Sequence, residues 1–262
     1  MATKRQRKIA VPQSPLYNLS RLKPLTENQK LLFEHYDAGA NFIMVHGVAG
    51  TGKTFCSMYK AFEEVFTAKS IIDKLYIIRS TVQCRDIGHL PGNLEEKIGI
   101  YKQPYQQICS ELIPSKLSET AVKINTPWEE LQKLNMVEML TTSFLRGITL
   151  NNCVIIVDEC QNMNEAELDT IMTRIGTNSR IVFCGDFRQT DLNKSRYDVS
   201  GLQRFMSICK LMPESVMLEF NTDDIVRNAL VKSYIIAKTN FEDLQDEQHG
   251  YSPSSNSSKN NY

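Results

Sequence analysis

The stretch Phe42–Phe55, which reads FIMVHGVAGTGKTF, decides the fold of this chain. Its apolar start predicts a buried strand over residues 42–46, and the pattern from Lys53 predicts a helix over residues 53–69. The glycines between them fit G-x-x-x-x-G-K-T, the phosphate-binding P-loop, which needs a strand before it and a helix after it. A plain Gly-rich turn is the alternative, but the complete motif stands in the required context.

This segment is a candidate nucleotide site. Glycine lets the backbone curl so that successive N–H groups point at phosphate oxygens, and the N-terminus of the following helix adds partial positive charge. We expect Lys53 to reach the β- and γ-phosphates and the hydroxyl of Thr54 to bind Mg²⁺. The candidate binding residues are Gly47, Val48, Ala49, Gly50, Thr51, Gly52, Lys53 and Thr54.

The composition of the chain indicates which classes of protein and which compartment are compatible with it. The chain has 262 residues, 42% of them hydrophobic and 23% charged, with a formal net charge of zero, so binding to nucleic acid would need a local basic patch. The cysteines number 7, an odd count without a CxxC pair, which argues against a zinc site or a disulfide framework and for a reducing compartment. The sequence predicts no membrane span and no signal peptide, so we expect a cytoplasmic protein.

The two ends differ from the body in composition. Residues 1–20 are basic and polar, and they predict a flexible arm that either contacts nucleic acid or is a solvated tail. Residues 241–262 become rich in Ser, Asn and Gln, which predicts a disordered polar tail. The body, residues 21–240, is expected to be one domain.

Short apolar runs alternate with helical patterns through the body. Strands are predicted at 42–46, 75–79, 137–143, 153–158, 180–184 and 216–220. Helices are predicted at 53–69, 94–97, 101–112, 165–175, around 199–210 and at 223–238. This alternation predicts an α/β fold with a mainly parallel sheet flanked by helices, and such sheets bind ligands at the carboxyl ends of their strands.

An acid pair follows one of these strands, in VIIVDECQ at residues 154–161. Asp158 is placed to hold Mg²⁺, and Glu159 is placed to activate an attacking water. An acidic helix N-cap is the alternative. A second acid directly after the first favours hydrolysis over transfer to a bound acceptor, so an ATPase is favoured over a metabolite kinase.

Two glutamines extend the candidate site. Gln189 lies in GDFRQTD after the strand at 180–184, where it would contact the γ-phosphate and report hydrolysis to the opposite face; a polar turn is the alternative. Gln29 lies in TENQ upstream of the P-loop, where its amide would read the adenine edge; a polar helix start is the alternative.

Together these motifs resemble the superfamily-one helicase core and, more closely, the PhoH family of P-loop ATPases, with a bacteriophage-type PhoH-like protein as the nearest pattern. The segments that carry the resemblance are GVAGTGKT (47–54), IGHLPGNLEEK (87–97), SFLRGITL (143–150), VIIVDECQNM (154–163), GDFRQTDL (185–192) and DDIVRNALV (223–231). The resemblance implies a single RecA-like P-loop NTPase domain that binds ATP and Mg²⁺, with catalytic roles for Lys53, Glu159 and Gln189. It also implies helicase-like activity on RNA or single-stranded DNA, in the host cytoplasm if the protein is encoded by a phage.

A helicase core uses two sheet domains around ATP, and this chain has room for one. We therefore expect a homo-oligomeric ring in which a neighbour supplies an arginine, and the resemblance implies six subunits. Arg227, expected one turn into the last helix, is the first candidate, and Arg146 is the second. A surface salt bridge is the alternative for either residue.

Candidate nucleic-acid contacts follow the strand at 75–79. They are Arg79, Thr81, Arg85 and His89 for phosphates, and Lys97, Tyr101, Lys102 and Tyr105 for charge and base stacking. A solvated surface or a subunit interface would explain the same residues. A nucleotide-dependent switch that recruits a protein partner is the main functional alternative to a nucleic-acid ATPase.

Overall fold

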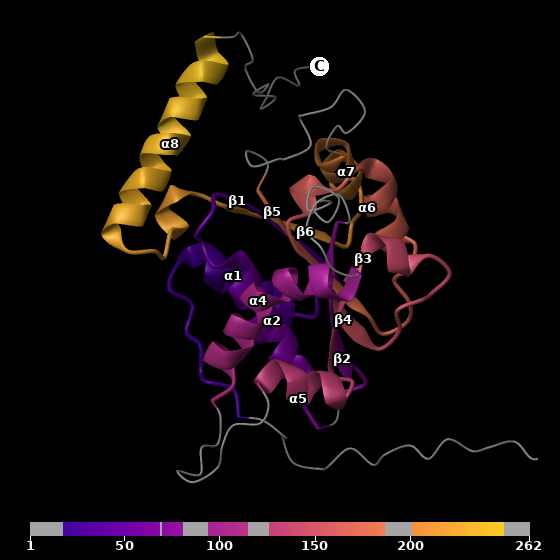
Figure 1. Cartoon of the computed structure of the whole chain (residues 1–262). Helices are drawn as coiled ribbons and strands as arrows, with labels where there is room; N and C mark the ends of the chain where they lie inside the picture. The colour runs from indigo at the N-terminus through magenta and orange to yellow at the C-terminus, as the bar shows by residue number, and fades with distance from the viewer. Residues whose placement is uncertain (1–17, 69, 81–93, 115–125, 187–200, 249–262) are drawn as a thin grey trace, which may run out of the picture.

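The computed structural model describes residues 18–68, 70–80, 94–114, 126–186 and 201–248 (Figure 1). Its centre is one 6-stranded sheet with the order β3-β2-β4-β5-β1-β6. The strands are β1 (Phe42–Gly47), β2 (Lys74–Arg79), β3 (Val137–Thr141), β4 (Cys153–Val157), β5 (Arg180–Gly185) and β6 (Ser215–Phe220). Every pair of neighbours in this sheet runs parallel, as the alternating sequence pattern predicts.

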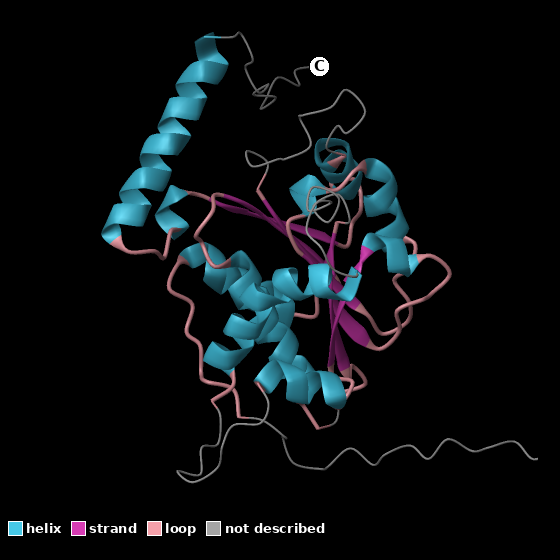
Figure 2. Cartoon of the chain, in the orientation of Figure 1, coloured by secondary structure: helices cyan, strands magenta, loops and turns pink. Residues whose placement is uncertain are grey.

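Helices cover both faces of the sheet (Figure 2). The α-helices are α1 (Glu27–Asp37), α2 (Lys53–Val65), α4 (Leu94–Leu112), α5 (Pro127–Lys133), α6 (Glu165–Met172), α7 (Leu202–Cys209) and α8 (Ala229–Gln248). The 3₁₀ turns are η1 (Thr142–Leu145), η2 (Cys160–Asn162) and η4 (Thr222–Asp224). None of the helices in the described part of the chain is long and apolar enough to cross a membrane.

The core divides into two clusters because alternate residues of a strand point to opposite faces. Ile43 and Val45 of β1 join the cluster that contains Phe62 of α2 and Trp128 of α5. Met44, between them in sequence, joins the cluster covered by α6 and α7. All of the central strand β4 is buried, which explains its continuous apolar run.

Helix α8 departs from this layered arrangement. In Figure 1 it extends away from the body of the molecule, beyond the P-loop end of β1. Four large apolar side chains on it are more than half exposed: Leu230, Tyr234, Phe241 and Leu244. Their positions follow the 4-3 spacing of a coiled-coil seam when Ala237 is included.

The structure corrects several sequence-based boundaries. Residues 94–112 form one helix, with Pro104 inside it, where the sequence predicted two short ones. The last helix begins at Ala229, not at 223, because residues 222–224 form a 3₁₀ turn capped by Asn221. It continues to Gln248, so residues 241–248, assigned to a polar tail, are helical.

Helix α5 was not predicted from the sequence, and the start of α1 was considered only as the alternative role of the segment that contains Gln29. Thr26 caps α1 by accepting from the N–H of Gln29, and Thr126 begins a capping box with Glu129 at the start of α5. These caps are visible in the sequence as Thr-x-x-Gln and Thr-x-x-Glu. The apolar positions that follow are few, so hydrophobic periodicity alone did not reveal either helix.

The end of β1 depends on a glycine. Gly47 has φ +119°, and a Cβ atom there would lie 1.9 Å from the carbonyl oxygen of Phe220 on β6. That same oxygen accepts from the N–H of Val48 at 2.9 Å. The backbone at the start of the P-loop is therefore in close contact with β6, and only glycine fits at position 47.

We predict that Gly47→Ala lowers the free energy of unfolding by about 2–4 kcal/mol, through both the positive φ and the overlap with Phe220. Gly39→Ala is the matched control, since Gly39 has φ +91° but no atom within 4 Å of an added Cβ. It should cost only about 1 kcal/mol. Urea unfolding followed by circular dichroism measures both, and equal losses would contradict the role given to the overlap.

Candidate nucleotide site

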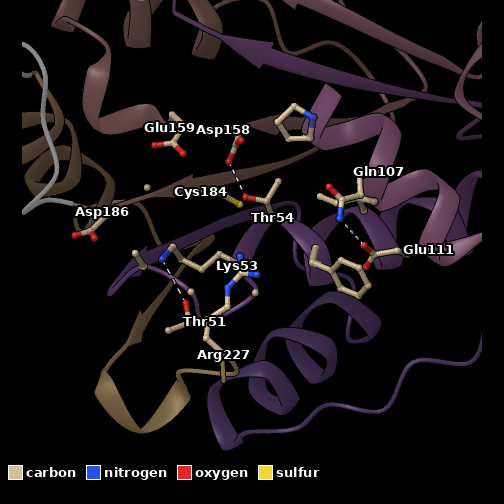
Figure 3. A pocket seen from close by; sticks show the side chains of 17 residues that line it. Thr51, Lys53, Thr54, Gln107, Glu111, Asp158, Glu159, Cys184, Asp186 and Arg227 are labelled. Atoms are coloured by element: carbon tan, nitrogen blue, oxygen red, sulfur yellow. Dashed lines mark hydrogen bonds between the residues drawn. The ribbon is translucent and has the colours of Figure 1, made fainter. Parts of the chain in front are cut away.

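Glycines give the P-loop its curl. Gly50 and Gly52 have φ +76° and +80°, in the left-handed region that side chains disfavour. Gly52 is also the N-cap of α2, so the first N–H groups of that helix point toward the loop. Residues 49–55 line a pocket of about 380 Å³, shown in Figure 3. This geometry is compatible with the phosphate-binding role that the motif predicts.

Lys53 lies inside the curve of the loop. Its Nζ donates to the carbonyl oxygens of Gly47 at 2.8 Å and Val48 at 2.7 Å. Burial lowers the pKa of the ammonium, while the nearby carboxylate of Asp186 acts in the opposite direction. A partly desolvated cation interacts more strongly with a phosphate oxygen than one in bulk water. The lysine is therefore placed for the phosphate-binding role expected from the sequence.

Thr54 and Asp158 form the candidate magnesium site. Thr54 Oγ1 donates to Asp158 Oδ1 at 2.7 Å, which joins the start of α2 to the end of β4. Both are hard oxygen ligands of the kind that Mg²⁺ takes together with phosphate oxygens and water. Asp158 is buried, so its charge needs partners. The residues present fit a nucleotide-bound magnesium ion.

A tyrosine completes the environment of Asp158. Tyr105, on α4, donates its hydroxyl to Asp158 Oδ2 at 2.6 Å and is only 1% exposed. Burial raises the pKa of the phenol well above its usual value, and the charge of Asp158 raises it further, so Tyr105 stays a donor. The sequence interpretation offered this ring for base stacking; that is wrong, because its ring and hydroxyl are buried against Asp158 and Trp128.

Glu159 sits beside the magnesium site in a strained conformation, with φ +54° and ψ +41°. Burial raises the pKa of its carboxyl, and the charge of Asp158 raises it further; Arg79 acts in the opposite direction. A raised pKa brings a carboxylate closer to the range of an effective general base. The electrostatic surroundings of Glu159, at the position after β4 that the sequence predicted, therefore suit a general base.

Gln161 connects the two strand ends of the site. Its Nε2 donates to Glu159 Oε2, and its Oε1 accepts from the N–H of Asp186 at 3.1 Å. It is 2% exposed, so the amide is held in place between the ends of β4 and β5. The sequence interpretation gave it no role, although it stands within the quoted motif. The sequence feature that could have revealed this role is the spacing of Gln161, two residues after Glu159 on the same turn.

Of the two glutamines expected at the site, the structure describes Gln29 alone. Gln29 is buried behind the P-loop, where its Nε2 donates to Thr51 O at 3.0 Å and its Oε1 accepts from Leu25 N at 2.8 Å. It does not line the pocket. Gln189 lies outside the described residues, although Asp186, three positions earlier, lines the pocket.

Arg227 lines the pocket of its own chain. Its Cγ lies 3.0 Å from the position that a Cβ atom on Gly50 would take, so the side chain packs against the P-loop. It comes from the segment between η4 and α8, not from a helix. The sequence interpretation gave this arginine to a neighbouring subunit's site. In the structure it is already placed in cis, and Figure 3 shows it below Lys53.

Some of the residues expected to contact nucleic acid lie at or near the carboxyl ends of the strands, beside the pocket. Arg79 ends β2, with its guanidinium 5.2 Å from the ring centre of Tyr101. Lys102 is half-buried on α4. The other expected contacts, Thr81, Arg85 and His89, lie outside the described residues, as does the side chain of Lys97.

Comparison with known proteins identifies relatives across this whole region. The family model described as PhoH-like protein matches residues 21–238. A PhoH-like protein of Mycobacterium leprae is 30% identical over 228 residues, covering 85% of this chain and 60% of the relative. A PhoH-like protein of Synechocystis is 33% identical, covering 73% and 54%. The chain thus spans between half and two thirds of the length of these relatives.

Two solved structures show a distant likeness. The large terminase of a thermophilic bacteriophage matches 81% of this chain and 50% of its own, with 12% identity and a TM-score of 0.46. The Pif1 helicase of Candida albicans matches 75% of this chain and 41% of its own, with 14% identity and a TM-score of 0.35. These values are too low to bear on the chemistry of the site.

We predict that Tyr105→Phe raises the Mg²⁺ concentration needed for half-maximal nucleotide binding about tenfold, because Asp158 loses a charge-assisted hydrogen bond that orients it. Titrating Mg²⁺ against a fluorescent ATP analogue measures this shift. Tyr59→Phe is the matched control, since it removes a tyrosine–glutamate bond of 2.8 Å to Glu63, away from the pocket. A wild-type magnesium requirement in Tyr105→Phe would refute the positioning role.

Proposed function

The chain belongs to the PhoH-like family of P-loop proteins, and we propose that it is a magnesium-dependent ATPase that acts on RNA or single-stranded DNA in a helicase-like manner. The observation that carries the proposal is the bond from Thr54 on the P-loop helix to Asp158, with Glu159 following directly at the end of β4. This arrangement provides a phosphate cradle, a magnesium site and a general base at one edge of the sheet.

The chain's own residues divide the work of hydrolysis. Bound Mg²⁺ would supply charge neutralisation at the β- and γ-phosphates, held from the protein side by Thr54 and Asp158. Lys53 adds a fixed positive charge at the loop. Glu159 accepts the proton of the attacking water, and Gln161 holds its carboxylate in place. Arg227 reaches the pocket from the opposite side and is suited to bind the γ-phosphate.

Exposed residues at the strand ends support a nucleic-acid partner. Phe144, in η1 directly after β3, is 49% exposed, and Arg146, two residues later, is also exposed. An aromatic ring next to a guanidinium offers base stacking together with a phosphate contact. Arg79 ends the neighbouring strand β2, so the three side chains belong to adjacent strand ends. We assign this edge to the strand of RNA or DNA.

We also propose that the protein assembles as a homo-oligomeric ring of six. Arg227 lines the pocket of its own chain, so Arg146 becomes the candidate for an arginine supplied by a neighbour. It is exposed at the strand-end edge, where a head-to-tail contact could bring it to another subunit's nucleotide.

A nucleotide-dependent switch that recruits a protein partner is the second candidate function. The exposed apolar positions of α8, Leu230, Tyr234, Phe241 and Leu244, favour it. The helix starts two residues after Arg227, so a change at the nucleotide would be transmitted to this surface directly. Slow hydrolysis without stimulation by nucleic acid would be its signature.

Steady-state ATP hydrolysis with and without single-stranded RNA and DNA tests the proposal. We expect one polymer to raise the rate and Glu159→Gln to lower it by about 10²–10⁴-fold while ATP binding persists. Glu165→Gln, an isosteric change on α6 outside the pocket, is the control and should keep the wild-type rate. An ATP hydrolysis rate that neither RNA nor DNA changes would favour the nucleotide-dependent switch. Normal turnover in Glu159→Gln would refute the role of Glu159 as the general base.

Mixing inactive variants tests the ring and the two arginines. Arg227→Ala should lose about 10³-fold in rate and stay inactive when mixed with Glu159→Gln, because both residues serve one pocket. Arg146→Ala mixed with Glu159→Gln should recover activity, because a mixed interface joins an intact Glu159 to a neighbour's intact Arg146. Recovery with Arg227→Ala would show that this residue acts across the interface, and no recovery with Arg146→Ala would remove it as the trans arginine.

A further inference from the structure

The pocket has a second end, on α4, that the hydrolytic residues do not use. Five residues form it: Phe55 at the start of α2, and Pro104, Gln107, Ile108 and Glu111 on α4. Figure 3 shows Gln107 and Glu111 on one side of Thr54, and Glu159 and Asp186 on the other. The phosphate cradle lies between these two groups.

The direction of a bound nucleotide follows from the cradle. The γ-phosphate must lie near Glu159, because that residue activates the water that attacks it. Lys53 binds the β- and γ-phosphates and Thr54 would hold their magnesium ion, so the α-phosphate and the nucleoside leave the loop on the side away from Glu159. That side of the pocket is lined by Phe55 and the α4 residues.

The side chains at this end suit a nucleoside and not a phosphate. The ring of Phe55 and the side chains of Pro104 and Ile108 offer apolar surface for a flat base. Glu111 carries negative charge, which would repel a phosphate group. Glu111 lies at the end away from the magnesium ligand Asp158 and the base Glu159, so its carboxylate is placed to accept from hydrogen-bond donors of the ligand.

A hydrogen bond between two of these residues determines which donor and acceptor groups remain for a ligand. Gln107 Nε2 donates to Glu111 Oε1 at 3.0 Å, one helical turn apart. This leaves the second carboxylate oxygen and the Gln107 amide oxygen as acceptors, with one amide hydrogen as a donor. A ribose hydroxyl or an exocyclic amine is the matching donor group.

Gln29, the residue that the sequence suggested for the base, is oriented elsewhere. It is 3% exposed, and both ends of its amide are bonded within the protein, to Leu25 and to Thr51. Its bond to Thr51 O instead supports the P-loop from behind.

We propose that α4, through Gln107 and Glu111 together with Phe55, forms the subsite that binds the nucleoside part of the nucleotide and sets nucleotide preference. The inference rests on the proposed ATPase function, since it assumes a triphosphate on the P-loop. It gives α4 two roles at one site, because Tyr105 on the same helix holds Asp158.

Comparing two ligands tests this assignment by binding alone. ATP fills both ends of the pocket, whereas inorganic tripolyphosphate fills only the cradle. Isothermal titration with Mg²⁺ present measures the affinity of each ligand for wild type, Glu111→Ala, Gln107→Ala and Phe55→Ala. Gln103→Ala is the matched control, because Gln103 is exposed on the same helix one turn before Gln107 and does not line the pocket.

We expect each pocket variant to bind ATP about tenfold more weakly, with tripolyphosphate affinity unchanged and Gln103→Ala like wild type. Unchanged ATP affinity in all three variants would overturn the subsite. Equal weakening of ATP and tripolyphosphate would also overturn it, since that pattern means damage to the cradle. A wild-type protein that binds neither ligand would instead refute the proposed function itself.

The milder Glu111→Gln variant keeps the shape of the side chain and identifies the donor. A smaller preference for ATP over 2′-deoxy-ATP than in wild type would assign Glu111 to the ribose, and a smaller preference for ATP over GTP would assign it to the base. If neither ratio changes, Glu111 makes no contact with the nucleoside.

Discussion

The carboxylate of Asp158 is the group on which the rest of the site depends. It accepts from Thr54 on one oxygen and from Tyr105 on the other, at 2.7 Å and 2.6 Å. A buried carboxylate is costly unless its lone pairs are bonded, so Thr54 and Tyr105 both stabilise it. Through these two bonds the end of β4, the P-loop helix α2 and the pocket wall α4 form one unit.

Parallel pairing brings the remaining groups to the same edge. The P-loop follows β1, the acid pair follows β4, and Asp186 follows β5, all at the carboxyl ends of neighbouring strands. Gln161 then bonds the last two strand ends to each other. The ends of β4 and β5 are therefore joined through the side chain of one buried residue.

One helix and one connecting segment close the pocket from outside the sheet. Helix α4 provides the side chains at one end, and the segment before α8 provides Arg227 at the side of the P-loop. Ile235 of α8 also lies close to Gly50, so the first turns of this exposed helix contact the loop directly.

The sequence by itself determined the six strands, the P-loop, and the placing of Asp158 and Glu159 at a strand end. These features are local: a motif needs only its neighbours, and continuous apolar runs mark buried strands. Only the tertiary structure decided that Tyr105 holds Asp158, that Gln29 supports the loop, and that Arg227 faces its own pocket. Each of these depends on contacts between residues 22 to 177 positions apart, as with Gln29 and Thr51 or Gly50 and Arg227, and such contacts leave no periodic trace in the chain.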